Sequence, residues 1–394
     1  MTSFVSHLEC PRCGRSYDHR QLATVCECGS PLLVEYDLDR VAAAVSIQDL
    51  ATRDRTMWRY RELLPVEDES RIVTLGEGWT PLLHASRLGE AVGVPDLWVK
   101  DEGLLPTGTF KARGAACGIT AAVERGVTEV ALPSAGNAGG AWAAYGAAAG
   151  TAVHVAVPSD TPELMRLECE AYGASVALVD GSISDAGRVV EEESQRNGWL
   201  NAATLREPYR IEGKKTLGLE IAEQLDWRFP DVIVYPAGGG VGLIGIWRAL
   251  TQLRSLGWVP GDQPRLVIVQ ATGCAPLVKA FREGSEESEP WPDPHTVAVG
   301  LRVPKALGDF LVLRAVRESG GTALSVTDDE ILSAMTRMAR EAGVLACPEG
   351  AATLAAVQAM RSSGELGGSE RVVLVNTGNA LKYAEALREA ARRT

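Results

Sequence analysis

The stretch Pro106-Thr-Gly-Thr-Phe-Lys-Ala-Arg-Gly-Ala115 gives the clearest indication of the fold. Pro106 and Gly108 end one element, and residues Thr109 to Ala116 can begin a helix with Lys111 in its first turn. A helix N-terminus repels positive charge, so it favours the neutral amine of Lys111, the form that attacks a carbonyl to make a Schiff base. The alternative is an ordinary surface lysine, the commonest fate of this residue type. Other motifs of the chain favour the first interpretation.

A glycine loop, Gly238-Gly-Gly-Val-Gly242, stands between the strand-like run Asp231–Pro236 and the helical pattern Leu243–Leu250. Strand, glycine loop and helix together offer backbone N–H groups and a helix N-terminus to a phosphate. Glycine keeps side chains out of the way and permits positive φ. A simple turn is the alternative. The loop has the layout of neither a dinucleotide fingerprint nor a Walker A motif.

Two more strand-like runs end in polar residues. Ser134-Ala-Gly-Asn-Ala-Gly139 follows residues 129–133, and Asn137 there offers an amide donor and acceptor at a helix start. Helix capping is the alternative role for Ser134 and Asn137. A buried run, Val372–Val375, leads into Asn376-Thr377-Gly378, where a hydroxyl can hydrogen-bond a ring nitrogen or where the residues simply form a turn.

These four motifs together resemble those of the pyridoxal-phosphate enzymes of the tryptophan-synthase-β type, called fold type II, over roughly residues 70 to 394. The resemblance is greatest to the threonine synthases. It rests on four further strings: Gly76-Glu-Gly-Trp-Thr-Pro-Leu82, Pro208-Tyr-Arg-Ile-Glu-Gly-Lys-Lys-Thr216, Pro348-Glu-Gly-Ala-Ala-Thr-Leu354 and Thr377-Gly-Asn-Ala-Leu-Lys382. The second is similar to the family string R-x-E-G-x-K-T.

The resemblance implies an α/β protein of fold type II, with two open twisted α/β domains and the cofactor between them, to which the N-terminal cysteine pairs described below add a small zinc-ribbon-like knuckle. Residues 1–40 would form the knuckle, 41–110 and 190–394 the large cofactor-binding domain, and 111–189 the small domain. The apolar runs agree with α/β layering, because they are typical of buried parallel strands; they are 153–157, 175–179, 232–235, 266–269 and 372–375. Helical patterns lie at 328–342, where Asp328 can cap, and at 351–361.

The resemblance also implies a role for each motif. Lys111 would hold pyridoxal 5'-phosphate as an internal aldimine and then move protons on the substrate carbons. Asn137 would hydrogen-bond the cofactor's 3-hydroxyl, and Thr377 would meet its pyridine nitrogen. The cofactor's phosphate would lie in the loop of Gly238, Gly239, Gly240, Val241 and Gly242. A phosphorylated substrate needs cationic and hydroxyl donors of its own, for which Ser134, Arg166 and Arg210 are candidates.

The implied reaction converts O-phospho-L-homoserine and water to L-threonine and phosphate. Thr377 favours a synthase, because the related ammonia-lyases usually carry serine there. Two departures keep the substrate open: many threonine synthases have a G-N-x-G-N phosphate loop, and many have Lys-Asp-Arg where this chain has Lys111-Ala-Arg. A serine or threonine ammonia-lyase, or a β-replacement enzyme such as a cysteate synthase, is the alternative within the class. A non-catalytic zinc-ribbon binding protein is the alternative outside it.

Two cysteine pairs mark the N-terminal segment. Cys10-Pro-Arg-Cys13 and Cys26-Glu-Cys28 are each followed by glycine, as tight zinc knuckles require for thiolates about 2.3 Å from the metal. Disulfides are the alternative. The remaining cysteines stand singly in apolar contexts, which suits buried thiols in a reducing cytosol; they are Cys117, Cys169, Cys274 and Cys347.

Composition is that of a globular enzyme, with 46% hydrophobic and 23% charged residues. The net charge of −12 and the absence of a basic run beside the cysteines argue against nucleic-acid binding. The first ten residues lack an apolar run, so we expect no secretion signal and a cytoplasmic protein. Residues 130–159 lack charge, but their Ala and Gly content and two prolines favour a buried helix and strand over a membrane span. We expect a small-molecule amino-acid substrate, and the resemblance implies a homodimer.

Overall fold

The computed structural model describes residues 3–393, and these divide into two compact units. Among the described residues, unit 1 comprises 3–79, 111–217 and 252–258, and unit 2 comprises 80–110, 218–251 and 259–393. Both units combine helices with sheets, so the α/β fold class predicted from the sequence is confirmed.

The strands of unit 1 are β1 (Val5–Glu9), β2 (Ser16–Tyr17), β3 (Leu33–Tyr36), β6 (Glu129–Pro133), β7 (Ala152–Pro158), β8 (Ser175–Val179) and β9 (Leu200–Asn201). Its helices are α1 (Leu38–Ala44), α2 (Ile47–Ala51), α4 (Lys111–Glu124), α5 (Asn137–Ala149), α6 (Glu163–Ala171) and α7 (Ile183–Asn197), with 3₁₀ turns η1 (Met57–Leu63) and η2 (Glu69–Arg71). Helix α8 (Tyr209–Gln224) begins in unit 1 and ends in unit 2, and α9 (Val241–Ser255) runs the other way.

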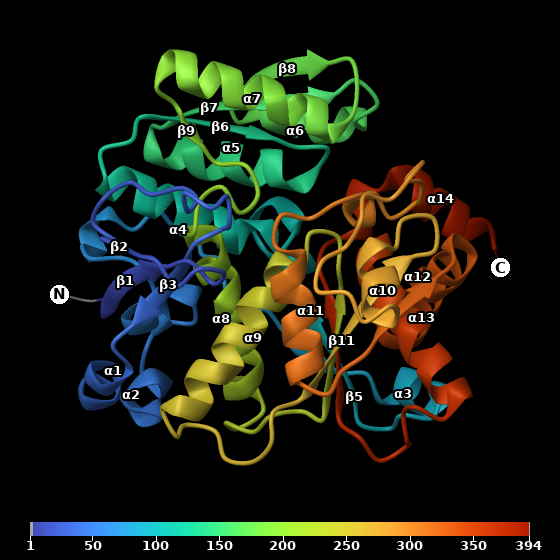
Figure 1. The fold of residues 1–394 in the computed structure, drawn as a ribbon. Coiled ribbons are helices and arrows are strands. Elements are labelled where there is room, and N and C mark those ends of the chain that lie inside the picture. Colours follow the sequence, from blue (N-terminus) through green and yellow to red (C-terminus); the bar gives the residue numbers. More distant parts are fainter. Residues whose placement is uncertain (1–2, 394) are drawn as a thin grey trace. The chain divides into compact units, whose positions relative to one another are not determined.

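A parallel sheet of order β8-β7-β6-β9 organises unit 1, with α7 on one face and α5 on the other (Figure 1). Small buried side chains of β6, β7 and α7 let these layers approach closely; they are Ala131, Ala156, Ala186 and Val190. The strands predicted at 153–157 and 175–179 are confirmed. The prediction that both are buried is wrong for β8, because it is the edge strand and leaves Leu178 58% exposed.

The N-terminal strands form a second, antiparallel sheet of order β2-β1-β3. The Tyr36 hydroxyl at the end of β3 donates to Glu212 Oε2 of α8 at 2.8 Å. Lys215, on the same helix, forms an ion pair with Glu212 and places its Nζ 3.9 Å from the centroid of the Tyr36 ring. A buried polar cluster therefore attaches the N-terminal sheet to α8 within unit 1.

The strands of unit 2 are β4 (Leu82–His84), β5 (Leu97–Asp101), β10 (Val232–Pro236), β11 (Arg265–Ala271), β12 (Ala323–Val326) and β13 (Val372–Asn376). Its helices are α3 (Ser86–Val92), α10 (Pro276–Arg282), α11 (Asp309–Glu318), α12 (Asp328–Ala342), α13 (Pro348–Ser363) and α14 (Ala384–Arg392). Short 3₁₀ turns are η3 (Glu102–Leu104), η4 (Pro106–Gly108), η5 (Val299–Leu301) and η6 (Ala380–Lys382).

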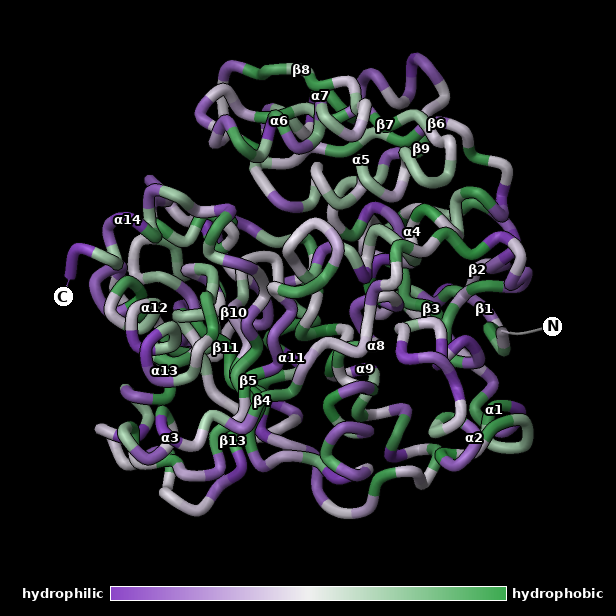
Figure 2. Tube along the Cα trace, turned by 180° about the vertical axis from the view of Figure 1, so that it is seen from behind, coloured by the Kyte–Doolittle hydropathy of each residue, from purple (hydrophilic) through white to green (hydrophobic). Residues whose placement is uncertain are grey.

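The sheet of unit 2 has the order β12-β11-β10-β13-β5-β4 and is parallel except for β4. Figure 1 shows it nearly edge-on, with α9 and α11 on one side and α12 and α13 on the other. The central strands β10 and β13 are buried along their whole length, and Figure 2 shows the apolar character of β5, β10 and β11. The runs predicted at 232–235, 266–269 and 372–375 are confirmed as buried parallel strands.

Helix α12 has the predicted bounds, but its predicted cap is wrong. Thr327 is the N-cap, and with Glu330 it forms a capping box. Asp328 instead accepts hydrogen bonds from the Thr296 hydroxyl at 2.6 Å and from the backbone N–H of Val297 at 3.1 Å. Among the described residues no helix is long and apolar enough to cross a membrane.

Candidate active site

Lys111 lies in the first turn of α4, as predicted, but the helix begins at Lys111 and not at Thr109, whose backbone is extended. The preceding residues lie along the end of β13, in unit 2. The backbone N–H of Phe110 donates to the Thr377 carbonyl at 3.0 Å, and the N–H of Asn379 donates to the Gly108 carbonyl at 2.9 Å. The residues before the lysine are therefore held against the strand end that carries Thr377.

Two buried threonine hydroxyls lie at this strand end. The Thr377 side chain is 6% exposed, and its Oγ1 lies 3.5 Å from Sγ of Cys347. Thr109 is 1% exposed, and its hydroxyl has no hydrogen-bond partner within residues 3–393. A buried hydroxyl without a partner is costly, so a polar ligand here would offset that cost.

The loop from Gly238 to Gly242 joins β10 to α9, and no side chain larger than hydrogen fits at three of its positions. A Cβ at Gly238 would lie 2.2 Å from the Gly300 carbonyl oxygen, and one at Gly242 would lie 2.1 Å from the Tyr235 hydroxyl. Gly240 has φ +68°, and its Cβ would lie 2.2 Å from Cγ2 of Val312. The loop therefore requires glycine, and it leads into the N-terminus of a 15-residue helix, where an anion is favoured.

Tyr235 connects the loop to the lysine motif, a role that the sequence analysis missed. Its hydroxyl accepts a hydrogen bond from the Gly242 N–H, and burial raises the pKa of Tyr235. The Phe110 ring packs edge-on against the Tyr235 ring, with centroids 6.3 Å apart. The sequence contained one signal for this role, a tyrosine within a strand predicted to be buried. A buried phenol usually has a specific polar partner. The residues that precede Lys111, the glycine loop and the strand end at Thr377 thus meet within unit 2, whereas Lys111 itself belongs to unit 1.

The fourth motif lies in unit 1, where Gly136 is the N-cap of α5 and Ser134 accepts a hydrogen bond from the first turn of that helix. The Ser134 hydroxyl accepts from the backbone N–H groups of Gly136 at 3.2 Å and Gly139 at 2.9 Å, and it donates to the Gly136 carbonyl. Asn137 is the first residue of α5 and is half-buried. Neither Ser134 nor Asn137 is therefore the N-cap, although the Ser134 hydroxyl satisfies an N–H group of the first turn.

The two predicted substrate arginines lie on different helices of unit 1. Arg210 on α8 is 3% exposed; its guanidinium donates to Glu207, to the Thr204 hydroxyl and to the Ala202 carbonyl, and it lies over the Trp142 ring. Burial raises the pKa of Glu207 even though Arg210 opposes the shift. Arg166 on α6 is half-buried, and its Nε has no hydrogen-bond partner within the described chain.

Two glutamates of the family strings support the loops around them. Glu77 is fully buried and accepts from Trp58 Nε1 at 2.6 Å and from the Tyr145 hydroxyl at 2.6 Å, all within unit 1. In unit 2, Glu349 accepts from the Gly300 N–H at 2.6 Å, and the Gly300 carbonyl is the group that lies against Gly238. Glu349 therefore positions the wall of the glycine loop.

The four N-terminal cysteines form one cluster whose sulfur atoms all lie within 4.8 Å of one another. The Cys10–Cys28 and Cys13–Cys26 sulfur separations are 3.5 Å and 3.6 Å, close to the roughly 3.8 Å that a tetrahedral Zn–S₄ centre requires. The backbone N–H of Cys28 and the Tyr17 hydroxyl lower the pKa of Cys26 to about 6, which favours the thiolate that binds metal. The donor set fits zinc.

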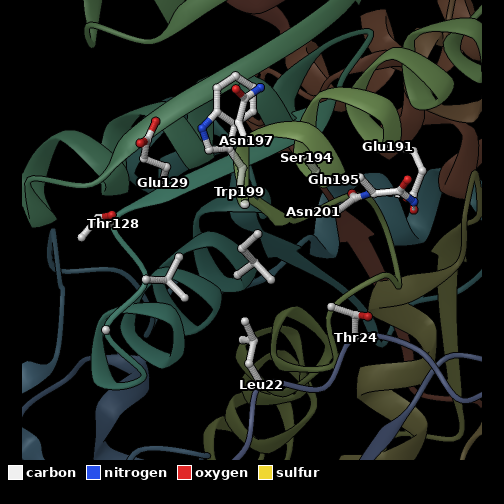
Figure 3. Close-up of a pocket in the computed structure, with 14 residues that line it drawn as sticks. Leu22, Thr24, Thr128, Glu129, Glu191, Ser194, Gln195, Asn197, Trp199 and Asn201 are labelled. Atoms are coloured by element: carbon white, nitrogen blue, oxygen red, sulfur yellow. Dashed lines mark hydrogen bonds between the residues drawn. The ribbon is translucent and has the colours of Figure 1, made fainter.

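A separate pocket of about 440 Å³ lies in unit 1 (Figure 3). Leu22 and Thr24 approach it from the segment between the cysteine pairs, and Trp199 and Asn201 lie on the opposite wall. His154 stacks on Trp199 with ring centroids 3.7 Å apart. None of the residues that the motifs single out lines this pocket, so it is not the site that the motifs predict.

The chain matches the family model described as "Pyridoxal-phosphate dependent enzyme" over residues 73–378. It is 36% identical to the threonine synthase of Methanocaldococcus jannaschii over 380 residues, which cover 96% of this chain and 93% of that protein. Identity to the threonine synthase of Methanosarcina acetivorans is 38%, covering 95% and 92% of the two chains.

Two solved structures show the same fold. The structure of maize serine racemase has a TM-score of 0.68 at 24% identity and covers 79% of this chain and 92% of its own. Diaminopropionate ammonia lyase from Escherichia coli has a TM-score of 0.69 at 19% identity, with coverage of 82% and 92%. With family match, relatives and fold in agreement, the chain belongs to the fold-type-II pyridoxal-phosphate dependent enzymes, and within them to the threonine synthase family.

Proposed function

We propose that this protein converts O-phospho-L-homoserine and water to L-threonine and phosphate with pyridoxal 5'-phosphate as cofactor. The observation that carries the proposal is the 36–38% identity to threonine synthases over about 95% of the chain. The ammonia-lyase and β-replacement alternatives share the fold, so they are separated by substrate rather than by architecture.

The residues present fit the cofactor. The loop from Gly238 to Gly242 must be glycine at three positions, because a Cβ there would clash with neighbouring protein atoms, and it leads into the helix N-terminus that favours a phosphate. The buried Thr377 hydroxyl at the end of β13 suits a ring nitrogen. Lys111 would hold the cofactor covalently, and Asn137 would hydrogen-bond its 3-hydroxyl. When bound, the cofactor supplies an electron sink for charge that develops on the substrate carbons.

In this proposal Lys111 is the proton carrier. Its amine takes and returns protons at Cα and Cβ of the substrate while phosphate leaves from Cγ, and water then adds at Cβ. Thr377 offers a neutral hydroxyl, which would leave the ring nitrogen unprotonated, whereas a carboxylate would stabilise the protonated nitrogen. Arg210, Arg166 and Ser134 are the proposed donors to the substrate. In support of Arg210, Glu207 and Trp142 hold its guanidinium in one orientation.

We also propose a structural zinc ion on Cys10, Cys13, Cys26 and Cys28, supported by the convergence of their sulfur atoms. Three further features stay predictions: the homodimer, the cytoplasmic location and the domain boundaries at residues 40, 110 and 190. The proposed partner is a small amino-acid substrate, with neither nucleic acid nor membrane.

The test compares two products. The purified holoenzyme should release phosphate from O-phospho-L-homoserine far faster than it releases ammonia from L-threonine or L-serine. An absorbance band near 410 nm, a rough expectation for this cofactor class, should accompany activity and would separate an enzyme from a binding protein. Ammonia release without phosphate release would make the protein an ammonia-lyase.

A further inference from the structure

The pocket of about 440 Å³ in unit 1, which we term the Trp199 cavity, is built by three parts of the chain that are distant in the sequence (Figure 3). Residues 126–129 lead into β6, residues 191–201 include the end of α7 and β9, and Leu22 and Thr24 lie between the two cysteine pairs. The volume falls within the range typical of sites for small organic molecules. None of the lining residues has a part in the proposed reaction.

The charged side chains that line the Trp199 cavity, among the described residues, are the carboxylates of Glu129 and Glu191, with no cation. Glu191 is half-buried, and its partners are neutral amides: Gln195 Nε2 donates to Oε1 at 2.8 Å, and Asn201 Nδ2 donates to Oε2 at 2.6 Å. The Oε2 atom of Glu129 lies 2.9 Å from Nε2 of His154. Because an amide does not neutralise a carboxylate, no cation of the described chain compensates Glu191.

The uncharged polar groups of the cavity are chiefly hydrogen-bond acceptors. The amide groups of Gln195 and Asn197 donate to Glu191 and Glu193, which leaves their side-chain carbonyl oxygens as acceptors. Ser194 also lines the cavity; it is 6% exposed, and its hydroxyl has no hydrogen-bond partner within the part of the chain that the structure describes. Since a buried polar group without a partner is costly, a ligand that donates hydrogen bonds would offset that cost.

Apolar surface faces these acceptors across the cavity. Trp199 is half-buried, and the His154 ring covers one of its faces, with centroids 3.7 Å apart. On the opposite wall Leu22 is 49% exposed, although it is a large apolar side chain. A ligand that covers Leu22 gains roughly 25 cal/mol for each Å² of apolar surface removed from water. The cavity therefore suits a molecule with an apolar body and a cationic donor group.

We propose that the Trp199 cavity binds a small organic ammonium ion with a short apolar body. The ammonium group donates to Glu191, and the body lies between Leu22 and Trp199. Glu129 is the first residue of β6, whereas Asn137 follows the other end of this five-residue strand, which spans roughly 16 Å. The ligand is therefore distinct from the substrate, and it connects the segment between the cysteine pairs to the parallel sheet of unit 1.

The experiment titrates the holoenzyme by calorimetry with three probes that share one apolar body: isopentylammonium, isopentanol and L-leucine. Isopentylammonium should bind roughly 10-fold more tightly than isopentanol, because its charge strengthens the hydrogen bond to Glu191. L-Leucine should bind more weakly than isopentylammonium, since its carboxylate would face two glutamates and no lining cation. Amide hydrogen exchange around Leu22 should slow when isopentylammonium is bound, because the ligand contacts that segment.

Two variants locate the binding. Glu191→Gln keeps the size of the side chain and should weaken isopentylammonium binding roughly 10-fold while leaving isopentanol binding unchanged. Glu192→Gln is the matched control, because it removes an exposed carboxylate of α7 that does not line the cavity. Leu22→Asn should weaken the binding of both probes. A primary amine also reacts with a cofactor aldehyde, but that reaction changes the cofactor absorbance and does not depend on Glu191.

Equal affinity of the wild type and Glu191→Gln for isopentylammonium would overturn the proposal. An equal loss in Glu192→Gln would overturn it too, by assigning the binding to the general negative charge of the surface. L-Leucine binding that depends on Glu191 and is as tight as that of isopentylammonium would contradict the choice of a ligand without a carboxylate. If Glu191→Gln does not fold, Leu22→Asn decides, since unchanged isopentylammonium affinity in that variant would place the ligand outside the cavity.

Discussion

The Sγ atom of Cys347 lies 3.5 Å from Oγ1 of Thr377, where the first turn of α13 meets the end of β13. Cys347 is the N-cap of α13, and its sulfur accepts from the Gly350 N–H at 3.3 Å. A thiol is a weak hydrogen-bond partner, so it orients the Thr377 hydroxyl without using its capacity to bond a ring nitrogen. This contact makes Thr377 the first residue to test.

Replacing Thr377 by alanine should lower kcat/KM by an amount equivalent to about 1–3 kcal/mol, because the ring nitrogen loses a buried partner. Thr377→Ser keeps the hydroxyl and should keep most of the activity. The absorbance of the bound cofactor and steady-state kinetics check both. Thr251→Ala removes an exposed hydroxyl on α9 and is the control. An alanine variant with unchanged spectrum and rate would exclude the assignment.

Lys111→Ala should abolish turnover, because no other residue is proposed to hold the cofactor covalently or to move protons at Cα. Borohydride reduction of the wild-type holoenzyme followed by peptide mapping should label Lys111. Labelling of Lys214, the buried lysine on α8 beside it, would instead show that the covalent attachment has been assigned to the wrong residue.

The glycine loop can be tested with a matched pair of variants. Gly240 and Gly150 have nearly the same φ, +68° and +69°, but a Cβ at Gly240 would lie 2.2 Å from Val312, whereas nothing lies within 4 Å at Gly150. Each alanine variant should lose about 1–2 kcal/mol of unfolding free energy to the backbone conformation. Gly240→Ala should lose about 1–3 kcal/mol more of unfolding free energy, because its Cβ overpacks the loop against Val312. The same variant should also bind the cofactor more weakly. Denaturant unfolding and cofactor titration measure the two effects; equal losses in both variants would contradict the packing argument.

Tyr36→Phe should lower the free energy of unfolding by about 1.5–3 kcal/mol, because its hydroxyl donates to the fully buried carboxylate of Glu212. The variant leaves the ring over Lys215, so the loss isolates the hydrogen bond. Tyr172→Phe, at a position 42% exposed, should change stability little and is the control. Equal unfolding midpoints for the two variants would show that the Tyr36 hydroxyl contributes nothing.

Metal analysis of the purified protein should find about one zinc ion per chain, since four thiolates converge and so short a segment has little core of its own. Chelation should increase proteolysis within residues 5–36 more than it lowers turnover. Cys10→Ser should have the same effect without chelator. A metal-free protein whose N-terminal sheet resists protease would exclude the zinc ion.

Local patterns were enough to predict much of the fold and the position of the lysine. Apolar runs identified β7, β10, β11 and β13, and α12 has its predicted bounds. Proline and glycine before Lys111 were sufficient to predict a helix with Lys111 in its first turn, because these residues constrain the backbone wherever they occur, although the helix begins two residues later than predicted. The spacing of the cysteines predicted their cluster, because tight local turns bring neighbouring thiols together.

Other features depend on neighbours that are distant in the sequence, and the tertiary structure alone decided them. The composition of β8 could not show that it is an edge strand, because an edge strand and a central strand differ only in the strands that pair beside them. Composition could not assign Lys215 to Tyr36 and Lys214 to the side of α4 that carries Lys111, although the two lysines are adjacent. The sequence by itself determined the local backbone and the order of the motifs, whereas burial and partners, which set the charge and role of each side chain, arise only when helices and strands pack.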